Sequence, residues 1–299
     1  DRLTCAHAIV KYLISQKILV DGKKLPLFAG AFGIFGHGNV ACLGQALEEN
    51  KKELPTWRGH HEQNMALTGI AFSRAKRRKQ IFVATSSVGP GSTNMLTAAA
   101  VAMSNRLPML FLPGDTYANR MPDPVLQQVE HFNNPNITQN DAFKYVTRYF
   151  DRITRPEQIL QTFPQAIQTM IDPADCGPAC ISLSQDVQGE TFDYPEEFFN
   201  EKIHTIRRPR PDDYQIKQAA DLIKKSKNPI IISGGGIFYS DAMKELSQFA
   251  KKHNIPTAQT VMGYSTMKKD DPYFLGAIGG FGGKAPNDFM KKTDLAIAI

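Results

Sequence analysis

The sequence predicts an α/β protein: a doubly covered parallel sheet followed by a second, incomplete Rossmann-like α/β domain. Short apolar runs without polar alternation are typical of strands that are buried on both faces of a parallel sheet. Helix-like segments lie between these runs, as crossover connections require. The chain has 299 residues, whereas one ordinary domain has roughly 100–200. We therefore expect two domains.

The first domain is expected to alternate helices and strands. Thr4 is placed to cap an opening helix whose apolar residues recur on one face. A helix-like stretch runs to Glu49, and an extended segment surrounds Trp57. The expected strands are residues 25–32, 81–85, 109–112 and 179–183, and the further helices are residues 62–76, 92–104 and 156–170.

The expected domain boundaries are 1–187 for the first domain, 188–213 for a linker and 214–299 for a partial central domain. The linker is predicted from its prolines, its many charges and its few apolar clusters. The second domain should contain a helix at 216–224, a strand at 229–233, a glycine turn at 234–236 and a helix at 240–253. A parallel strand normally continues into a crossover helix, so the final apolar strand, 294–299, leads us to expect a C-terminally truncated chain.

Composition excludes several classes of protein. Hydrophobic residues make up 42% and charged residues 21%, which is typical of globular chains. The net charge of +6 includes one dense basic run, 76–79, at a predicted helix end, so we expect no nucleic-acid partner. No apolar stretch reaches the roughly 18 residues of a membrane span. The four cysteines lack zinc-ligand spacing, and we expect a cytoplasmic protein without a membrane partner.

The first candidate motif, 33–38, follows a predicted strand and contains Gly33, Gly36 and Gly38 around His37. Glycines at the carboxyl edge of a parallel sheet let backbone amides approach a ligand closely. A tight turn without a ligand explains the motif equally well.

The second candidate motif, 58–63, places Glu62 at the start of a helix after His60 and His61. A carboxylate at that position is often only a cap that stabilises the helix dipole. The adjacent histidines do not converge on one metal ion.

The third candidate motif, 86–94, contains Gly89, Pro90 and Gly91 and then Ser92, Thr93 and Asn94 at a helix start. It matches neither a Walker loop nor a dinucleotide-binding fingerprint. A phosphate, or a ring held by backbone groups, would fit it.

The order and spacing of these motifs resemble the pyrimidine-binding domain of thiamine diphosphate (ThDP) enzymes, such as acetolactate synthases and benzoylformate decarboxylases. In that family a Phe-Gly-x-Pro-Gly turn, a helix-opening Glu and a Thr-Ser-Gly-Pro-Gly-Ala-Thr-Asn loop follow one another. The matching residues are Phe32, Gly33 and Gly36, with Phe35 in place of the proline, then Glu62, then Gly89, Pro90, Gly91, Thr93 and Asn94. Residues 229–236, 255–257 and 275–280 look like the family's central domain, so essentially the whole chain is covered.

Residues 33–40, 105–108, 113–115 and 123–130 are similar to one branch of the family, which opens a cyclic 1,2-dione in myo-inositol catabolism. The resemblance therefore implies ThDP-dependent hydrolysis of a C–C bond, with a cyclic polyol dione as the small-molecule substrate. Two alternatives remain open. One is another ThDP enzyme, an acetolactate synthase-like carboligase or a 2-oxo acid decarboxylase. The other is a non-catalytic module whose glycine turns at 234–236 and 279–283 hold a nucleotide.

The resemblance also implies roles for individual residues. Glu62 would hydrogen-bond the pyrimidine ring nitrogen of the cofactor, so that the exocyclic nitrogen can take the thiazolium C2 proton. Gly36, Gly89, Pro90 and Asn94 would help to bind the cofactor. His37 and Asp115 are further catalytic candidates, and His60 or His61 could move protons or bind hydroxyls. The alternatives are a histidine ring bonded within its own turn and an aspartate that caps a turn.

The family holds Mg²⁺ and the diphosphate through a Gly-Asp-Gly and a downstream Asn on a separate domain. No Gly-Asp-Gly occurs in these 299 residues. The resemblance therefore implies that the metal ligands lie on a C-terminal domain outside this chain, and it predicts no metal site here. It also implies a homodimer or homotetramer when the protein is full length, because the site forms between two subunits.

Overall fold

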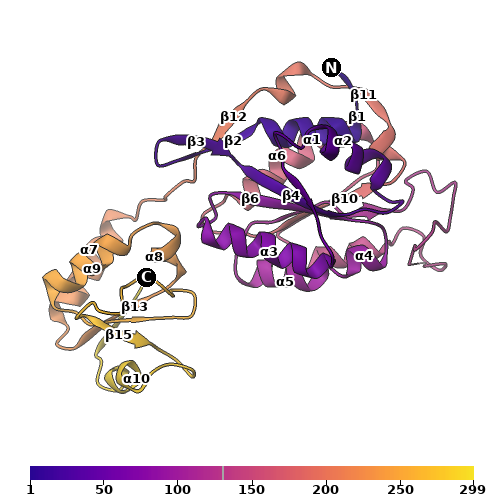
Figure 1. Cartoon of the computed structure of the whole chain (residues 1–299). Coiled ribbons are helices and arrows are strands. Elements are labelled where there is room, and N and C mark those ends of the chain that lie inside the picture. Colours follow the sequence, from indigo (N-terminus) through magenta and orange to yellow (C-terminus); the bar gives the residue numbers. More distant parts are fainter. Residues whose placement is uncertain (130) are drawn as a thin grey trace. The chain divides into compact units, whose positions relative to one another are not determined.

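The computed structural model describes residues 1–129 and 131–299, and it divides the chain into two compact units, Asp1–Arg207 and Arg208–Ile299 (Figure 1). The last residue of the motif 123–130, Glu130, lies outside the described residues. Each unit has its own parallel sheet. No helix in the described ranges combines the length and the apolar composition that crossing a membrane requires.

The first unit is built around a parallel sheet. Its strands in spatial order are β5 (Thr56–Arg58), β4 (Phe28–Ile34), β6 (Ile81–Ser86), β7 (Leu110–Phe111), β10 (Ala179–Ser184) and β8 (Gly114–Asp115), and β9 (Tyr149–Ile153) also pairs with β10. The described pairings in this sheet are all parallel. Both β6 and β10 are buried along their whole length, which explains their apolar runs without alternation. The predicted fold class is confirmed.

Helices cover both faces of this sheet (Figure 1). One face carries α1 (Cys5–Ser15), α2 (Gln45–Glu49) and α6 (Ile159–Met170), and the other carries α3 (Glu62–Ala75), α4 (Pro90–Thr93) and α5 (Leu96–Ser104). The core under α1 and α6 contains Ile9, Val83, Phe163 and Ile181, each at most 1% exposed. Thr4 caps α1 as predicted, because its side chain accepts a hydrogen bond from the backbone N–H of His7.

The predicted strand 25–32 is divided in the structure. Its first part belongs to β3 (Lys23–Pro26), which forms an antiparallel hairpin with β2 (Gln16–Val20), and its second part begins the central strand β4. Asp21 and Gly22 make the hairpin turn with positive φ values of 49° and 76°. An Asp-Gly pair between two short strands is a strong hairpin signal, so this hairpin could have been predicted from the sequence.

The predicted helix 92–104 is also divided, since α4 ends at Thr93 and α5 begins at Leu96. Short helical turns complete this unit. They are a π-helical turn, Val40–Gly44, and the 3₁₀ helices Gln139–Tyr145, Pro156–Gln158, Val187–Gly189 and Glu196–Phe199.

Most of the segment predicted as a linker, 188–213, packs on the first unit. Strand β11 (Thr191–Asp193) pairs with β1 (Arg2–Thr4), and β12 (Lys202–His204) pairs with β2. Tyr194 is only 2% exposed, and the ring of Phe198 stacks on Tyr12 with the ring centroids 4.3 Å apart. These aromatic side chains, placed between charged residues and prolines, anchor the segment. The division between the units falls at Arg207 and Arg208.

The second unit has a four-stranded parallel sheet in the order β15 (Phe274–Ala277), β14 (Thr257–Gln259), β13 (Pro229–Ser233) and β16 (Leu295–Ala298). Its helices are α7 (Asp213–Lys225), α8 (Gly235–Tyr239), α9 (Met243–His253) and α10 (Lys284–Met290). The final apolar strand, β16, pairs in parallel with β13 along four residues. The core contains Ile231, Leu246 and Ala250.

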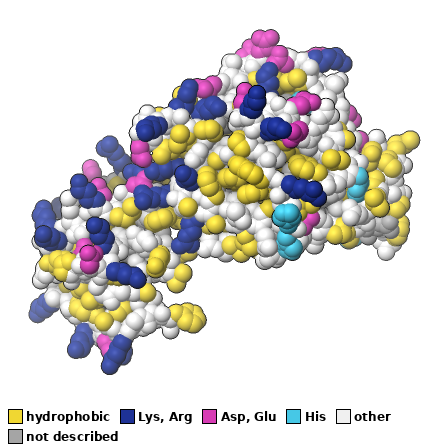
Figure 2. All heavy atoms as spheres, viewed as in Figure 1, with side chains coloured by type: hydrophobic (Ala, Val, Ile, Leu, Met, Phe, Trp, Pro, Cys, Tyr) yellow, Lys and Arg dark blue, Asp and Glu magenta, His cyan; other side chains and the backbone are white. Residues whose placement is uncertain are grey.

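Charged side chains are mixed over the visible surface. On the face seen in Figure 2, Lys and Arg side chains are spread among acidic and apolar ones and do not form one continuous patch. The described cysteines, Cys5, Cys42, Cys176 and Cys180, are free, and burial raises the pKa of each thiol.

Candidate active site

Three loops meet at the carboxyl edge of the central sheet, because β5, β4 and β6 are parallel neighbours. Gly33 on β4 lies beside Arg58 on β5 and Thr85 on β6. The backbone N–H of Gly59 also donates a hydrogen bond of 3.0 Å to the carbonyl oxygen of Gly33. The loops that carry the three predicted motifs therefore leave the sheet side by side, where open α/β sheets bind their ligands.

An open pocket of about 850 Å³ lies between these loops. Its walls include Gly36, Glu62, Pro90 and Asn94, one or more residues from each predicted motif, and Gln127 from the loop after β8. The volume falls in the range of roughly 300–1,000 Å³ that is usual for ligand sites. Among the described residues, neither lysine nor arginine lines this pocket. Glu62 is the one acidic residue among the described residues of its wall.

Glu62 is the first residue of α3, after His61 in an extended conformation. Its side chain is half-buried at the pocket wall, and its Oε2 accepts a hydrogen bond of 2.8 Å from Nδ2 of Asn94. The other oxygen, Oε1, faces Gly91, where an added Cβ would lie 3.3 Å from it. The structure thus joins the helix-opening acid to the Gly-Pro-Gly loop.

The glycines differ in their relation to the pocket. Gly36 lies in its wall, and an added Cβ there would be 2.7 Å from Oγ of Ser87. Gly89 has a φ of +71° and lies directly beneath the carbonyl oxygen of Gln127. It is not one of the described wall residues, so Gly89 shapes the turn that presents Pro90 and Gly91 to the pocket.

The predicted histidines are placed differently from one another. His61 Nε2 lies 3.5 Å from Nδ2 of Asn94, next to Glu62. His60 is exposed. His37 is half-buried beside the pocket but is not one of its described wall residues, and its buried Nε2 has no hydrogen-bond partner in the described part of the chain.

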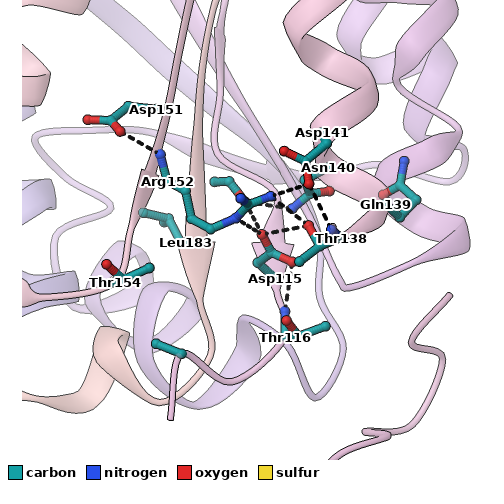
Figure 3. A network of polar contacts seen from close by, with 12 residues as sticks. Asp115, Thr116, Thr138, Gln139, Asn140, Asp141, Asp151, Arg152, Thr154 and Leu183 are labelled. Carbon is teal, nitrogen blue, oxygen red and sulfur yellow. Dashed lines mark hydrogen bonds and ion pairs between the residues drawn. The ribbon is translucent and has the colours of Figure 1, made fainter. Parts of the chain in front are cut away.

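Asp115 does not face the pocket. It is 2% exposed, and its Oδ2 accepts hydrogen bonds from Nε of Arg152 (2.8 Å) and from the hydroxyl of Thr138 (3.0 Å) (Figure 3). The hydroxyl of Ser182 donates to the same oxygen at 2.5 Å. Oδ1 of Asp115 accepts from the backbone N–H of Thr116. The position at a strand end suggested contact with substrate, but these partners enclose the carboxylate in a buried network.

The charge of Arg152 is balanced within this network. Its Nη2 donates to Oδ2 of Asp141 at 2.9 Å and to the hydroxyl of Thr138 at 2.8 Å. Burial lowers the pKa of Arg152, but the neighbouring Asp115 and Asp141 carboxylates more than compensate and leave it above the ordinary value. The buried guanidinium charge of Arg152 is therefore paired with carboxylates, and burial of a charge is costly without such pairing.

The network reaches the pocket through Asn140. Its Nδ2 donates to the carbonyl oxygen of Gly114 (2.9 Å) and to the hydroxyl of Ser182 (2.8 Å). Its Oδ1 lies 2.7 Å from the hydroxyl of Ser92, the buried third residue of α4. Polar groups on β8 and β10 thus support the short helix that begins at Pro90.

Sequence reasoning missed Asn140, Arg152 and Ser182. Asn140 lies 48 residues from Ser92, and Ser182 lies 67 residues from Asp115. No local spacing signals such pairings, since they depend on which strand lies beside which. Gln127 lies in the motif 123–130, and nothing in the residues around it predicts that its backbone carbonyl oxygen covers Gly89.

A second hollow, of about 110 Å³, lies in the loop after β8 and is lined by Thr116, Arg120, His131 and Phe132 among others. It shares no described wall residue with the larger pocket. Across the described residues, no group of three or more His, Cys, Asp or Glu side chains is placed to hold a metal ion.

Family models place the chain in a class. Residues 28–135 match the thiamine pyrophosphate enzyme N-terminal TPP binding domain, and residues 216–299 match the thiamine pyrophosphate enzyme central domain. Both matches agree with the fold and with the three loops around Glu62. The chain belongs to the thiamine pyrophosphate enzymes.

Three curated proteins that are similar to this chain have the same name. The chain is 48% identical over 298 residues to 3D-(3,5/4)-trihydroxycyclohexane-1,2-dione hydrolase of Geobacillus thermodenitrificans (strain NG80-2). The aligned region covers 100% of this chain and 47% of that protein. Proteins of the same name from Bacillus cereus (strain AH820) and Clostridium tetani (strain Massachusetts / E88) are also 48% identical, and 46% of each is covered. The chain thus spans just under half the length of these curated relatives.

Proposed function

We propose that the full-length protein uses ThDP to hydrolyse the ring C–C bond of a trihydroxycyclohexane-1,2-dione to 5-deoxy-glucuronate, a step of inositol degradation. The observation that carries this proposal is the meeting of Gly36, Glu62, Pro90 and Asn94 in one pocket at the carboxyl edge of the sheet. The identity of 48% to proteins named for this substrate supports the choice of reaction within the family.

The pocket residues fit the pyrimidine half of the cofactor. A ring can lie between the glycine turn at Gly36 and the Pro90-Gly91 turn, because Gly91 carries no side chain toward Oε1 of Glu62. That oxygen is placed to hold a proton shared with a ring nitrogen. The described part of the wall contains neither lysine nor arginine, which suits a neutral or cationic ring better than a diphosphate.

When bound, ThDP supplies an electron sink for the C–C bond that breaks. Hydrolysis of the bond between the two carbonyl carbons of a 1,2-dione consumes one water. The hydroxyl ends on one carbon, which becomes a carboxyl group, and the proton ends on the other, which becomes an aldehyde. No outside oxidant is needed. The task of Glu62 is to hold one proton at the pyrimidine ring, and the half-buried wall limits the access of water to it.

The remaining parts of the proposal concern groups beyond this pocket. We propose that Mg²⁺ and the diphosphate bind to residues outside this chain and that the full-length protein is a homodimer or homotetramer. The pocket supports this view, since it is open on one side and lacks a cation among its described wall residues. A cytoplasmic location is supported by the free cysteines, because reducing compartments keep thiols unpaired.

The direct test is an assay of the full-length gene product with trihydroxycyclohexane-1,2-dione, ThDP and Mg²⁺, in which acid formation is followed. We expect turnover of the dione and little turnover of pyruvate. Glu62→Gln should lower kcat by at least about 100-fold, as is usual when a positioned proton-transfer group is lost, with an unchanged thermal unfolding midpoint. Pyruvate turnover without dione turnover would contradict the proposed substrate.

A further inference from the structure

The hydrogen bond between Asn94 and Glu62 has a defined direction, from the amide to the carboxyl group. Nδ2 of Asn94 lies 2.8 Å from Oε2 of Glu62 and 3.5 Å from Nε2 of His61. A side-chain amide nitrogen has two N–H donors and does not accept hydrogen bonds. Both neighbours must therefore present lone pairs to it. Oε2 of Glu62 acts as an acceptor, and a proton on this carboxyl group is directed to Oε1.

The oxygen of Glu62 that Asn94 does not contact, Oε1, faces the Pro90-Gly91 turn in the pocket wall. Oε1 lies toward Gly91, at 3.3 Å from the position of an added Cβ, and Gly91 belongs to the pocket wall. Asn94 occupies the opposite oxygen. The two oxygens of this carboxyl group therefore differ in their surroundings: an amide holds Oε2, whereas Oε1 has no hydrogen bond to the residues that the structure describes.

Asn94 is itself held in place. It follows α4, and its backbone N–H donates a hydrogen bond of 3.0 Å to the carbonyl oxygen of Pro90. α4 is anchored by the buried hydroxyl of Ser92, which lies 2.7 Å from Oδ1 of Asn140, and Asn140 in turn bonds to Gly114 and Ser182. The amide that meets Glu62 is thus fixed to the sheet and not to a mobile loop.

We propose that Asn94 is a positioning residue for Glu62: it fixes Oε2 as an acceptor and leaves the shared proton on Oε1. This inference rests on the proposed role of Glu62. It gives Asn94 a role toward the acid, whereas the family resemblance implied a role in binding the cofactor. Asn94 should affect the chemical step, because a proton held at the correct oxygen needs no rearrangement during the reaction.

Two substitutions at Asn94 test the polarity of this contact in the full-length gene product. Asn94→Ala removes the donor and should lower kcat by about 10- to 100-fold, the range expected for a lost hydrogen bond to a charged group. Asn94→Asp keeps the shape of the side chain but, when ionised, replaces the donor by an acceptor that repels Glu62. Its protonated form can donate again, and the neighbouring carboxyl group favours that form. The activity of Asn94→Asp relative to wild type should therefore rise as the pH falls from about 8 to about 5.

The matched control is Asn64→Asp. Asn64 is exposed on the same helix as Glu62, two residues further along the chain. Its substitution adds the same charge near Glu62 without touching the Asn94 contact. We expect kcat within about twofold of wild type at every pH, since an exposed charge is well screened.

Binding and unfolding measurements complete the test. The affinity for ThDP, measured by calorimetry, should change by less than about threefold in Asn94→Ala, since the hydrogen bond acts on the reaction and not on binding. A constant ratio of Asn94→Asp to wild-type activity across the pH range would overturn the inference, and so would a loss of ThDP binding that accounts for the loss of kcat. Thermal unfolding of each variant identifies any loss of fold.

The two proposals can fail separately. If Glu62→Gln retains full activity, the proposed role of Glu62 fails and the inference fails with it. If Glu62→Gln is inactive while both Asn94 variants retain wild-type kcat, only the positioning role of Asn94 is wrong.

Discussion

The carbonyl oxygen of Gln127 lies directly over Gly89, at 1.8 Å from the position that a Cβ on Gly89 would take. Gly89 also has φ and ψ angles of 71° and −119°, which side chains disfavour. Two separate restraints therefore require glycine here, one from the backbone conformation and one from the loop after β8. That loop also supplies Gln127 and Val129 to the pocket.

Gly89→Ala should displace the loop around Gln127 and reshape the pocket. We expect ThDP affinity, measured by calorimetry, to fall by at least about tenfold, because a misplaced wall loses contacts worth more than about 1.4 kcal/mol. Gly22→Ala is the control, since Gly22 also has a positive φ but has nothing within 4 Å of an added Cβ. It should cost about 1 kcal/mol of stability through strain alone and leave ThDP affinity unchanged. Equal effects of the two variants on binding would refute the role of Gln127.

Asp115→Ala should destabilise the first unit. The substitution leaves Arg152, Ser182 and Thr138 without their common acceptor, and the breaking of a buried ion pair costs about 3 kcal/mol. Trp57 is the single tryptophan of these 299 residues, so its fluorescence during urea denaturation of this chain reports the stability of the first unit. Asp115→Asn keeps most of the shape and should cost less. Normal stability of Asp115→Ala together with lost activity in the full-length gene product would restore the catalytic role that the sequence suggested.

His204 should make the stability of the first unit depend on pH. Burial, with a smaller contribution from nearby Lys202, lowers the pKa of His204 to about 4, below the ordinary value of about 6.5. The unfolded chain binds the additional proton between these two values, so stability should fall as the pH decreases from about 6.5 towards 4. The loss attributable to this one group is on the order of 2–3 kcal/mol.

His204→Gln removes this titration. The ring donates from Nε2 to Oε1 of Gln16 at 2.9 Å, which holds β12 beside β2, and a glutamine amide can donate in its place. The urea midpoints of the variant at pH 7 and pH 4.5 should therefore differ less than those of wild type. Equal pH dependence in the two proteins would show that His204 is accessible to protons in the folded state.

Tyr194→Ala should destabilise the first unit by about 3–5 kcal/mol, the usual cost of truncating a large buried aromatic side chain. Tyr194→Phe removes the hydroxyl, which donates to the carbonyl oxygen of Pro156 and also interacts with the Cys5 thiol, and should cost about 1 kcal/mol. Urea denaturation followed at Trp57 measures both. Values near zero would mean that residues after 187 behave as a free linker, as the sequence analysis predicted.

Those parts of the site that lie within single turns could be predicted from the sequence. Gly36, Glu62, Pro90 and Asn94 each follow a strand by a few residues, and parallel strands bring such turns to one edge of the sheet. Asp115 obeys the same rule but was misjudged, because its environment depends on β9 and β10 from later in the chain. The rule locates the edge of the sheet, whereas burial depends on the neighbouring strands.

The fold was predictable to a similar extent. The buried strands β6 and β10 stand out because they are apolar along their whole length. The hairpin of β2 and β3 was missed although Asp21 and Gly22 signal it, because the apolar run after it dominated the pattern. Residues 191–204 were predicted as a linker because charged residues and prolines surround the few aromatic residues that pack this segment on the first unit.

Strand β10 is the last strand of the central sheet to leave the ribosome, yet it pairs with β7, β8 and β9. Its Ser182 also bonds to Asn140, which supports the turn next to Glu62. During synthesis, a nascent chain that stops before β10 contains every predicted motif but lacks the support beneath α4. The support beneath α4 can therefore form only after the residues of β10, Ala179–Ser184, have been translated.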